Sequence, residues 1–365
     1  MGLMVGSVKP KMMRGSDKVK AVYKGDTKLW SGDLEFWLGS GFKADEINPV
    51  TNISSAGVYG KLGIQYYDGR FFCLDADATS ITIRTTDDGV TYNVSFTLTG
   101  ISIQYLYASK HGLNMVNGVL YTTVFDSTAK QYHIISTKDG VTWSDVKISG
   151  VICPTYYGIG AVGVAFVGYI GGKYYIGLSS SDSMMSVYTS TDFISWGSVT
   201  QWGQSGLGLF SGCAFHNYNG TLYVIMYDGG AIKAYTVNTV NYVRTLIATK
   251  DSIGYSDGDG STYGGPVSCT VFAHILTFSF TQRGNNSTFY LTTSFDFINK
   301  KFMYVANNGY NPYSYIGYDG EMYYINQKSY NTVSWYYSTD MITFTPFTQD
   351  GIMGNVPFAF GKNIL

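Results

Sequence analysis

The chain is poor in the residues that bind metals and carry redox chemistry, with four cysteines and four histidines among 365 residues. No two cysteines are close enough in sequence for a zinc knuckle or a redox dithiol, and no histidines show metal-ligand spacing. Asp257 to Gly260 resembles half of a calcium loop, but the later carboxylate that would complete the cage is missing. We therefore expect no metal and no cofactor, and we expect the cysteines to be buried thiols. A disulfide between Cys213 and Cys269, which open comparable strands, is an alternative that the lack of a visible signal peptide disfavours.

Charged residues are also scarce, at 13%, and basic charge is concentrated in one place. Residues 1–28 hold seven basic and two acidic residues, whereas the remainder is acidic overall. A dense run of Lys and Arg is missing, so a docking segment is a better interpretation than a nucleic-acid or membrane arm. The longest apolar run, 156–178, is divided by Gly171 and Gly172 into two strands, so we expect no membrane insertion.

What the chain does have is a repeat. A turn followed by an aromatic residue recurs about every fifty residues, at 85–92, 136–143 and 190–196. Three weaker copies follow, and a small residue precedes an aromatic strand about twenty residues before every copy except the fifth. The capping positions of the six copies are Asp88, Asp139, Asp192, Asn238, Asp296 and Asp340.

Each copy predicts one four-stranded antiparallel meander, because glycine or Asp-Gly hairpin signals separate short strands rich in tyrosine. Helical periodicity is absent, and 33 tyrosines with 44 glycines are typical of many strands and turns. The predicted fold is all-β: a six-bladed β-propeller of four-stranded blades over 51–365, preceded by an N-terminal docking segment with a hairpin over 1–50.

The repeated form Ser-Thr-x-Asp-Gly-x-Thr-Trp resembles the Asp-box of sialidases and other Asp-box propellers. The resemblance implies that the Asp caps the turn between the third and fourth strands and that the aromatic residue wedges between blades. One departure is that Asp139, Asp192 and Asp340 stand four residues before the aromatic, whereas the family spacing is five; only Asp87 keeps it. This departure weakens descent from sialidases more than it weakens the architecture.

The same resemblance implies a test for sialidase activity, which uses three arginines, a tyrosine nucleophile with a glutamate partner, and an aspartic acid. A carboxylate clamp needs the bidentate geometry of guanidinium. The chain has only five arginines, and we expect only Arg283 to lie in a loop between second and third strands that faces the central site. Arg14, Arg70, Arg84 and Arg244 are expected in the N-terminal segment or in and beside strands.

The N-terminal segment contains a second resemblance. Residues 19–30 predict a hairpin that turns at Gly25-Asp26, with Tyr23 and Trp30 as anchors. The hairpin resembles those found in structural proteins of tailed-bacteriophage virions, which implies that Tyr23 and Trp30 dock into other virion proteins. An ordinary hairpin that packs under the ring is the alternative.

In a propeller, the loops that lead into the first strand of each blade gather around the axis, together with the loops between second and third strands. Aromatic residues are frequent in these predicted loops, and exposed tyrosine or tryptophan suits sugars or a protein epitope. Many of these rings could instead fill the axis. The candidate ligand-binding residues are Tyr105, Tyr107, Tyr156, Tyr157, Trp202, Tyr255, Tyr263, Arg283, Tyr310 and Tyr313.

Taken together, these features predict a bacteriophage virion protein of structural or adhesive function that is not an enzyme and has no catalytic residues. Its propeller would bind a host surface glycan or protein, its N-terminal segment would bind other virion proteins, and it would bind no nucleic acid. Homo-oligomers are compatible with this interpretation. The alternative is a sialidase-like glycoside hydrolase.

Overall fold

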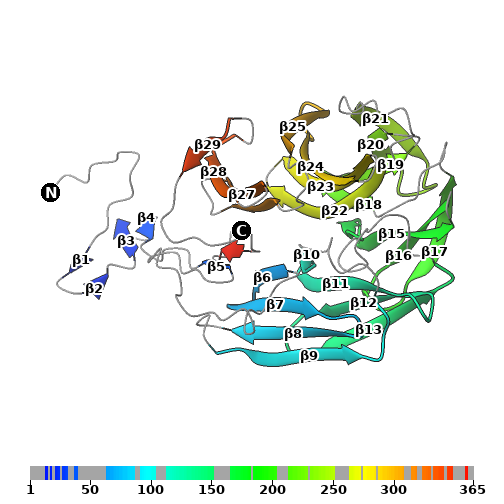
Figure 1. The fold of residues 1–365 in the computed structure, drawn as a ribbon, viewed down its shortest axis with the longest axis horizontal. Coiled ribbons are helices and arrows are strands. Elements are labelled where there is room, and N and C mark those ends of the chain that lie inside the picture. Colours follow the sequence, from blue (N-terminus) through cyan, green and yellow to red (C-terminus); the bar gives the residue numbers. More distant parts are fainter. Residues whose placement is uncertain are drawn as a thin grey trace.

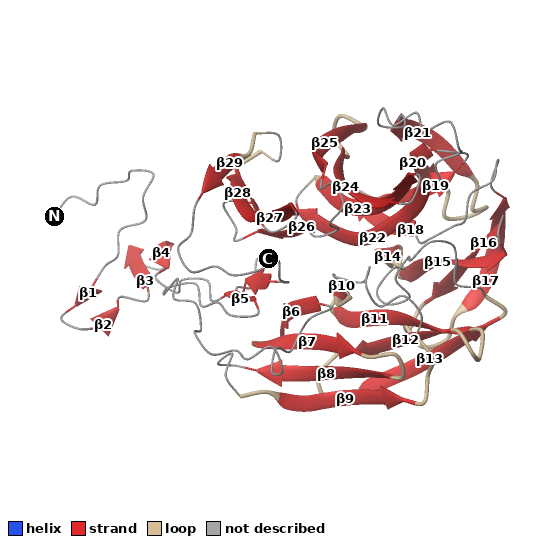
Figure 2. Cartoon of the chain, in the orientation of Figure 1, coloured by secondary structure: helices blue, strands red, loops and turns tan. Residues whose placement is uncertain are grey.

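In the computed structural model, the parts of the chain that are described form strands and connecting turns, without a helix (Figure 2). These described parts therefore contain no helix long and apolar enough to cross a membrane. The described residues are 13–14, 17–18, 21–24, 27–31, 37–39, 63–86, 91–103, 112–151, 165–181, 184–203, 213–228, 231–250, 263–272, 274–284, 287–307, 314–318, 323–329, 332–340, 343–347 and 358–360.

Within these residues the strands form six four-stranded antiparallel sheets, here called blades one to six, which follow one another around a ring (Figure 1). Strand order within every blade equals sequence order, so each blade is a simple meander. The prediction of an all-β propeller with four-stranded blades is confirmed.

Blade one contains β6 (Gly63–Tyr67), β7 (Arg70–Ala76), β8 (Ser80–Thr86) and β9 (Asn93–Thr99). Blade two contains β10 (Asn114–Val116), β11 (Val119–Asp126), β12 (Gln131–Thr137) and β13 (Trp143–Ser149). Blade three contains β14 (Gly168–Ile170), β15 (Lys173–Ser181), β16 (Met184–Ser190) and β17 (Gly197–Gly203). Blade four contains β18 (Cys213–Tyr218), β19 (Thr221–Asp228), β20 (Ala231–Val237) and β21 (Arg244–Lys250). Blade five contains β22 (Tyr263–Phe272), β23 (Ile275–Gly284), β24 (Ser287–Asp296) and β25 (Lys301–Asn307). Blade six contains β26 (Ser314–Tyr318), β27 (Tyr323–Ser329), β28 (Thr332–Ser338) and β29 (Thr345–Phe347).

Both ends of the chain contribute to a small sheet between the first and last blades. Strand β5 (Trp37–Gly39) pairs with β30 (Phe358–Phe360), and β30 packs against β6 and β26, the first strands of blades one and six (Figure 1). The sequence left open which terminus closes the ring, and the structure uses both. Two hairpins precede this sheet: β1 (Met13–Arg14) with β2 (Asp17–Lys18), and β3 (Ala21–Lys24) with β4 (Thr27–Ser31). The second is the hairpin predicted at Gly25-Asp26.

Side chains cap the described turns between third and fourth strands, as the Asp-box resemblance implied, whereas Asp87 and Asp88 of blade one lie outside the described residues. Asp139 Oδ1 accepts hydrogen bonds from the backbone amides of Val141 (2.8 Å) and Thr142 (2.7 Å). Asp192 and Asp296 cap their turns in the same way, and Asn238 does so with its amide oxygen. Each cap satisfies amides that the strand ladder leaves unpaired, so the turn is held in one conformation.

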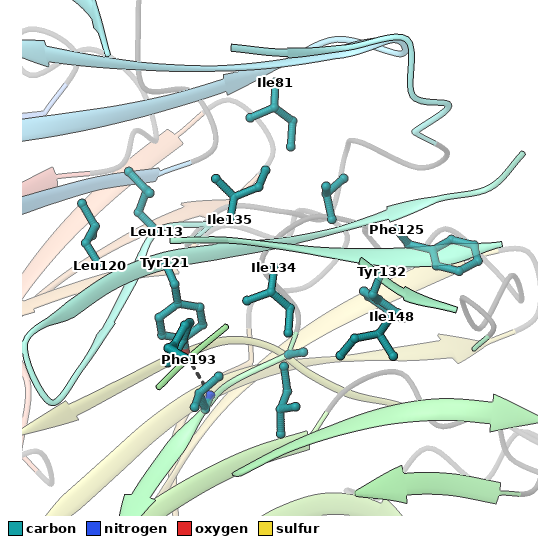
Figure 3. Packing of buried hydrophobic residues seen from close by; sticks show 14 of the residues in the cluster. Ile81, Leu113, Leu120, Tyr121, Phe125, Tyr132, Ile134, Ile135, Ile148 and Phe193 are labelled. Carbon is teal, nitrogen blue, oxygen red and sulfur yellow. Dashed lines mark hydrogen bonds between the residues drawn. The ribbon is translucent and has the colours of Figure 1, made fainter. Parts of the chain in front are cut away.

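The blades are held together by apolar faces that alternate along the strands. The largest buried cluster joins blades one to three, and Figure 3 shows Tyr121 packed beside Phe193 from the following blade. The Tyr121 hydroxyl accepts a hydrogen bond from the Val167 amide at 2.7 Å, which satisfies its polar atom inside the core.

Two kinds of aromatic wedge lie between blades. Trp143 packs against Phe96 of blade one and donates its indole hydrogen to Ser95 Oγ at 2.9 Å, which supports the wedge predicted for this residue. Phe193, which follows the capping Asp192, was not predicted as a wedge. It has φ +69° and is only 1% exposed, so its burial against Tyr121 and Tyr174 offsets the cost of the left-handed backbone.

Candidate active site

A buried carboxylate lies in the interface between blades three and four. Asp228 is the last residue of β19, and its facing partner in β20 is Ala231. Its side chain is only 6% exposed, and Oδ2 accepts a short hydrogen bond from the Tyr235 hydroxyl of β20. Strand alternation places Asp228 and Tyr235 on the same face of blade four, the face that packs against blade three.

Two cations stand beside this carboxylate. Lys233 Nζ is 3.8 Å and an Arg244 guanidinium nitrogen is 3.5 Å from Asp228 Oδ2. Both side chains are 19% exposed, so the cluster opens to solvent on the side of its cations. An unpaired buried carboxylate would be costly, and these neighbours stabilise its charge.

The guanidinium of Arg244 is fixed by blade three as well as by blade four. It donates a hydrogen bond to the Gly203 carbonyl at 2.7 Å and lies over the rings of Tyr235 (4.8 Å) and Trp202 (5.6 Å). Such stacking favours arginine over lysine. The cation is therefore held in place before any ligand arrives.

Burial of Tyr235 raises the pKa of its hydroxyl, and the hydrogen bond to Asp228 raises that pKa further. The group therefore stays a neutral phenol at physiological pH and acts as a donor to the carboxylate. A carboxylate that accepts a hydrogen bond from a phenol can take a proton from water, and the two cations beside it can stabilise negative charge that develops nearby.

Equivalent carboxylates in other blades show what is unusual about Asp228. Asp126, at the end of β11, accepts hydrogen bonds from the amides of Thr128 (2.9 Å) and Ala129 (3.2 Å) and so caps its own hairpin. Asp77, just after β7, accepts a hydrogen bond from the Thr79 amide at 2.7 Å. The repeat therefore offers an acid at this position, and blade four places Tyr235, Lys233 and Arg244 around its acid.

A pair formed by a histidine and a carboxylate is a weaker candidate for a catalytic site. His133 Nδ1 lies 2.8 Å from Asp145 Oδ1, an arrangement that can orient a general base. His133 is only 1% exposed, however, and its other ring nitrogen faces Gln131 at 3.5 Å. We assign this pair a structural role between blades one and two.

The described residues contain no group of three or more His, Cys, Asp or Glu that could hold a metal ion. Cys213 and Cys269 are free thiols, so the alternative disulfide between them is not formed. Burial raises the pKa of the Cys213 thiol to about 12, which makes it unreactive at neutral pH.

Three of the predicted ligand-binding residues are described, and all three lie in strands rather than in the predicted loops, while their binding of a ligand stays a prediction. Trp202 lies in strand β17 rather than in a loop and is 6% exposed, because its ring fills the interface under Arg244 and packs on Phe215. Arg283 lies in strand β23 rather than in a loop, because the hairpin with β24 extends to Gly284. Tyr263 begins β22 and pairs with Gln282. The other candidates, Tyr105, Tyr107, Tyr156, Tyr157, Tyr255, Tyr310 and Tyr313, lie outside the described residues.

The predicted docking residues Tyr23 and Trp30 lie in β3 and β4, and their docking role stays a prediction. Sequence reasoning missed the Asp228 cluster and placed Arg244 after a fourth strand, whereas Arg244 begins β21. The available signal was the presence of Asp228, Lys233 and Arg244 in strands that are otherwise mostly apolar or neutral.

No protein-family model matches the chain, and no curated protein sequence matches it. Among solved structures, a protein from Lactobacillus plantarum is similar over 89% of this chain and 98% of its own, with a TM-score of 0.56 and 9% identity. A protein from Bacteroides uniformis, provisionally described as a 6-phosphogluconolactonase, is similar over 90% of this chain and 100% of its own, with a TM-score of 0.55 and 12% identity. A periplasmic gluconolactonase from Pseudomonas aeruginosa is similar over 82% of this chain and 88% of its own, with a TM-score of 0.50 and 9% identity.

At these identities the likeness shows a shared propeller fold. The prediction of a non-enzymatic bacteriophage virion protein is nevertheless corrected by this comparison. Two of the three similar structures are described as lactonases, and none of the three is described as a bacteriophage protein. The prediction of a virion protein depended on a hairpin of about a dozen residues, whereas the similarity to these three structures extends over most of the chain.

Proposed function

We propose that this propeller is a hydrolase of a sugar-derived ester, of the lactone class. The observation that carries the proposal is the Asp228 carboxylate, which is buried, hydrogen-bonded by Tyr235 and flanked by Lys233 and Arg244. The propeller fold is compatible with this activity, since similar structures include proteins described as lactonases.

In the proposed reaction Asp228 takes a proton from a water molecule as that water attacks the lactone carbonyl. The carbonyl oxygen becomes an oxyanion, and Arg244 and Lys233 stabilise its charge. The ring C–O bond then breaks, and the proton on Asp228 passes to the leaving alkoxide, which gives a hydroxy acid. Tyr235 orients Asp228 throughout by donating its phenolic hydrogen.

A sialidase-like glycoside hydrolase is the second candidate. The cluster combines a tyrosine, a carboxylate and an arginine, residue types that the sialidase resemblance implies for catalysis. It ranks second because the raised pKa of Tyr235 keeps the phenol protonated, whereas a nucleophilic tyrosine must lose its proton.

In this proposal the turns that resemble Asp-boxes stabilise the fold and have no catalytic role. The side-chain caps of Asp139 and Asp192 support the interpretation that these turns are shortened Asp-boxes. Because the capped turns lie at the opposite ends of the strands from Asp228, they contribute stability rather than chemistry.

The test is a hydrolysis assay of the purified chain with glucono-δ-lactone, 6-phosphogluconolactone and a fluorogenic sialoside. We expect turnover of a lactone and its loss, by at least a hundredfold, in Asp228→Asn. Asp77→Asn is the matched control, because it changes the equivalent acid of blade one, and it should keep full activity. Turnover of the sialoside alone would favour the second candidate, and lactone turnover that survives Asp228→Asn would contradict the assignment.

A further inference from the structure

Four aliphatic side chains are exposed at the same position of four different blades. Each is the second residue after the capping Asp or Asn, in the turn between the third and fourth strands. They are Val141, Ile194, Val240 and Ile298, and their exposed fractions are 66%, 54%, 86% and 59%. Val90 and Ile342 occupy the same position in the sequence of blades one and six, outside the described residues. All six residues are β-branched and apolar, although the position faces water in the four described turns.

The caps hold these side chains outward. The backbone amides of Val141, Ile194, Val240 and Ile298 each donate to the capping side chain of their own turn, at 2.8, 2.8, 2.9 and 2.8 Å. A backbone fixed in this way cannot fold its side chain back onto the blade. Each turn therefore presents an apolar tip that is ordered before it meets a partner, which lowers the entropic cost of binding.

The tips lie on one side of the ring. All blades have the same strand order, so rotation about the ring axis relates the equivalent turns and keeps them at similar height. They are separated by the width of a blade and by polar turn residues. The result is a circle of separate apolar points rather than a continuous patch.

We propose that this circle of tips docks the propeller onto the surface of a phospholipid bilayer. Each Val or Ile side chain offers roughly 100 Å² of apolar surface. Four tips together reach about half of the roughly 800 Å² that one partner contributes to a stable protein interface, and they are not contiguous. A lipid surface accepts separate apolar points at once, and each CH₂ that enters it multiplies the partition coefficient roughly fourfold.

Basic residues beside the tips fit the same partner. Lys300 and Lys301 are exposed and stand two and three residues after Ile298, so their ammonium groups can reach lipid phosphates. Lys138, exposed beside the Val141 tip, donates to the Asp192 carbonyl at 3.0 Å and links two neighbouring turns. The capping acids lie in the same turns, so we expect anionic lipid to strengthen binding only modestly.

A local explanation is also available, because β-branched residues favour the extended backbone at these positions. Threonine separates the two explanations: it keeps the branch at Cβ and replaces a methyl or ethyl group with a hydroxyl. The test variant therefore combines Val141→Thr, Ile194→Thr, Val240→Thr and Ile298→Thr. Val94→Thr is the matched control, since Val94 is 62% exposed but lies in strand β9 rather than in a capped turn.

The experiment is co-sedimentation of the full chain with phosphatidylcholine vesicles, with and without phosphatidylglycerol. We expect the unmodified chain to bind both, the fourfold variant to bind at least tenfold more weakly with an unchanged Tm, and Val94→Thr to bind normally. Val240→Asp, a single change at the most exposed tip, should also weaken binding if the fourfold variant fails to fold. Failure of the unmodified chain to bind either vesicle would overturn the proposal. Self-association that the fourfold variant abolishes would overturn it too, because the tips would then bind a second copy.

Discussion

Tyr235 donates its phenolic hydrogen to Asp228 inside the interface between blades three and four, where the two residues are 6% and 4% exposed. They stand on adjacent strands of one blade, and Arg244 lies over the ring of the first and beside the carboxylate of the second. One phenol and one guanidinium thus fix the orientation and charge of the buried acid. The pair connects the packing of the interface to the proposed chemistry.

Replacement of Tyr235 by phenylalanine should show whether the Tyr235 hydroxyl orients Asp228 or binds the substrate. The ring stays under Arg244, but Asp228 loses the phenolic hydrogen bond, so we expect kcat for the lactone to fall about tenfold and KM to change little. Steady-state kinetics check this result, with far-UV circular dichroism as the control for folding. A rise in KM with kcat unchanged would instead assign the hydroxyl to substrate binding.

Trp143→Ala should destabilise the ring at the junction of blades one and two. The indole packs against Phe96 and Phe72 and bonds Ser95, so we expect a loss of about 3 kcal/mol in the free energy of unfolding. Urea denaturation measures this loss in the free energy of unfolding. Trp143→Phe keeps one aromatic ring but loses the hydrogen bond and part of the packing, so it should cost less than the alanine variant, about 1–2 kcal/mol. Equal stability of the alanine variant and the unmodified chain would show that the indole is not a wedge.

Gly140→Ala should cost more than Gly118→Ala, although both glycines have a left-handed backbone, with φ +69° and +71°. A Cβ at Gly140 would stand 2.9 Å from Phe72 Cζ, whereas a Cβ at Gly118 would meet nothing within 4 Å. We expect about 1–2 kcal/mol for the backbone alone at Gly118 and about 1–3 kcal/mol more at Gly140. Thermal and urea unfolding of the two variants provide the comparison, and equal losses would contradict the close approach to Phe72.

Burial lowers the pKa of His216 to about 4, so stability should begin to fall below about pH 6.5, and the capping acids should steepen the fall below about pH 4. Backbone amides lower the pKa of Asp139 and Asp192 in the folded chain, so protonation of these carboxyls favours the unfolded state. Their contribution is complete above the unfolded pKa and is lost as the pH falls toward the folded pKa. Urea midpoints between pH 2 and 7 measure the profile.

Asp192→Asn is the control for this profile, because Asn238 already caps the equivalent turn of blade four with an uncharged amide. The variant should keep its turn and lose part of the acid dependence. A midpoint that falls no more steeply below pH 4 than above it would show that groups other than these capping acids control the acid stability.

Much of the architecture follows from the sequence alone. The capping residues Asp139, Asp192 and Asn238, with the aromatic strands between them, predicted the repeated four-stranded blade, because turn chemistry and strand alternation act over a few neighbouring residues. The cap geometry and the wedge at Trp143 were expectations that followed from the resemblance to Asp-box propellers. Phe193 was missed as a wedge, since a phenylalanine with positive φ is stable only when a neighbouring blade buries its ring.

The sequence by itself therefore determined the repeat, the strands within each blade and the capped turns, all of which depend on local backbone preferences. Only the tertiary structure decided that Trp202 is buried, that both termini pair beside β6 and β26, and that Asp228 lies among Tyr235, Lys233 and Arg244. Those relationships join residues on different strands and blades. Their register depends on how whole sheets pack around the ring, which no short stretch of sequence encodes.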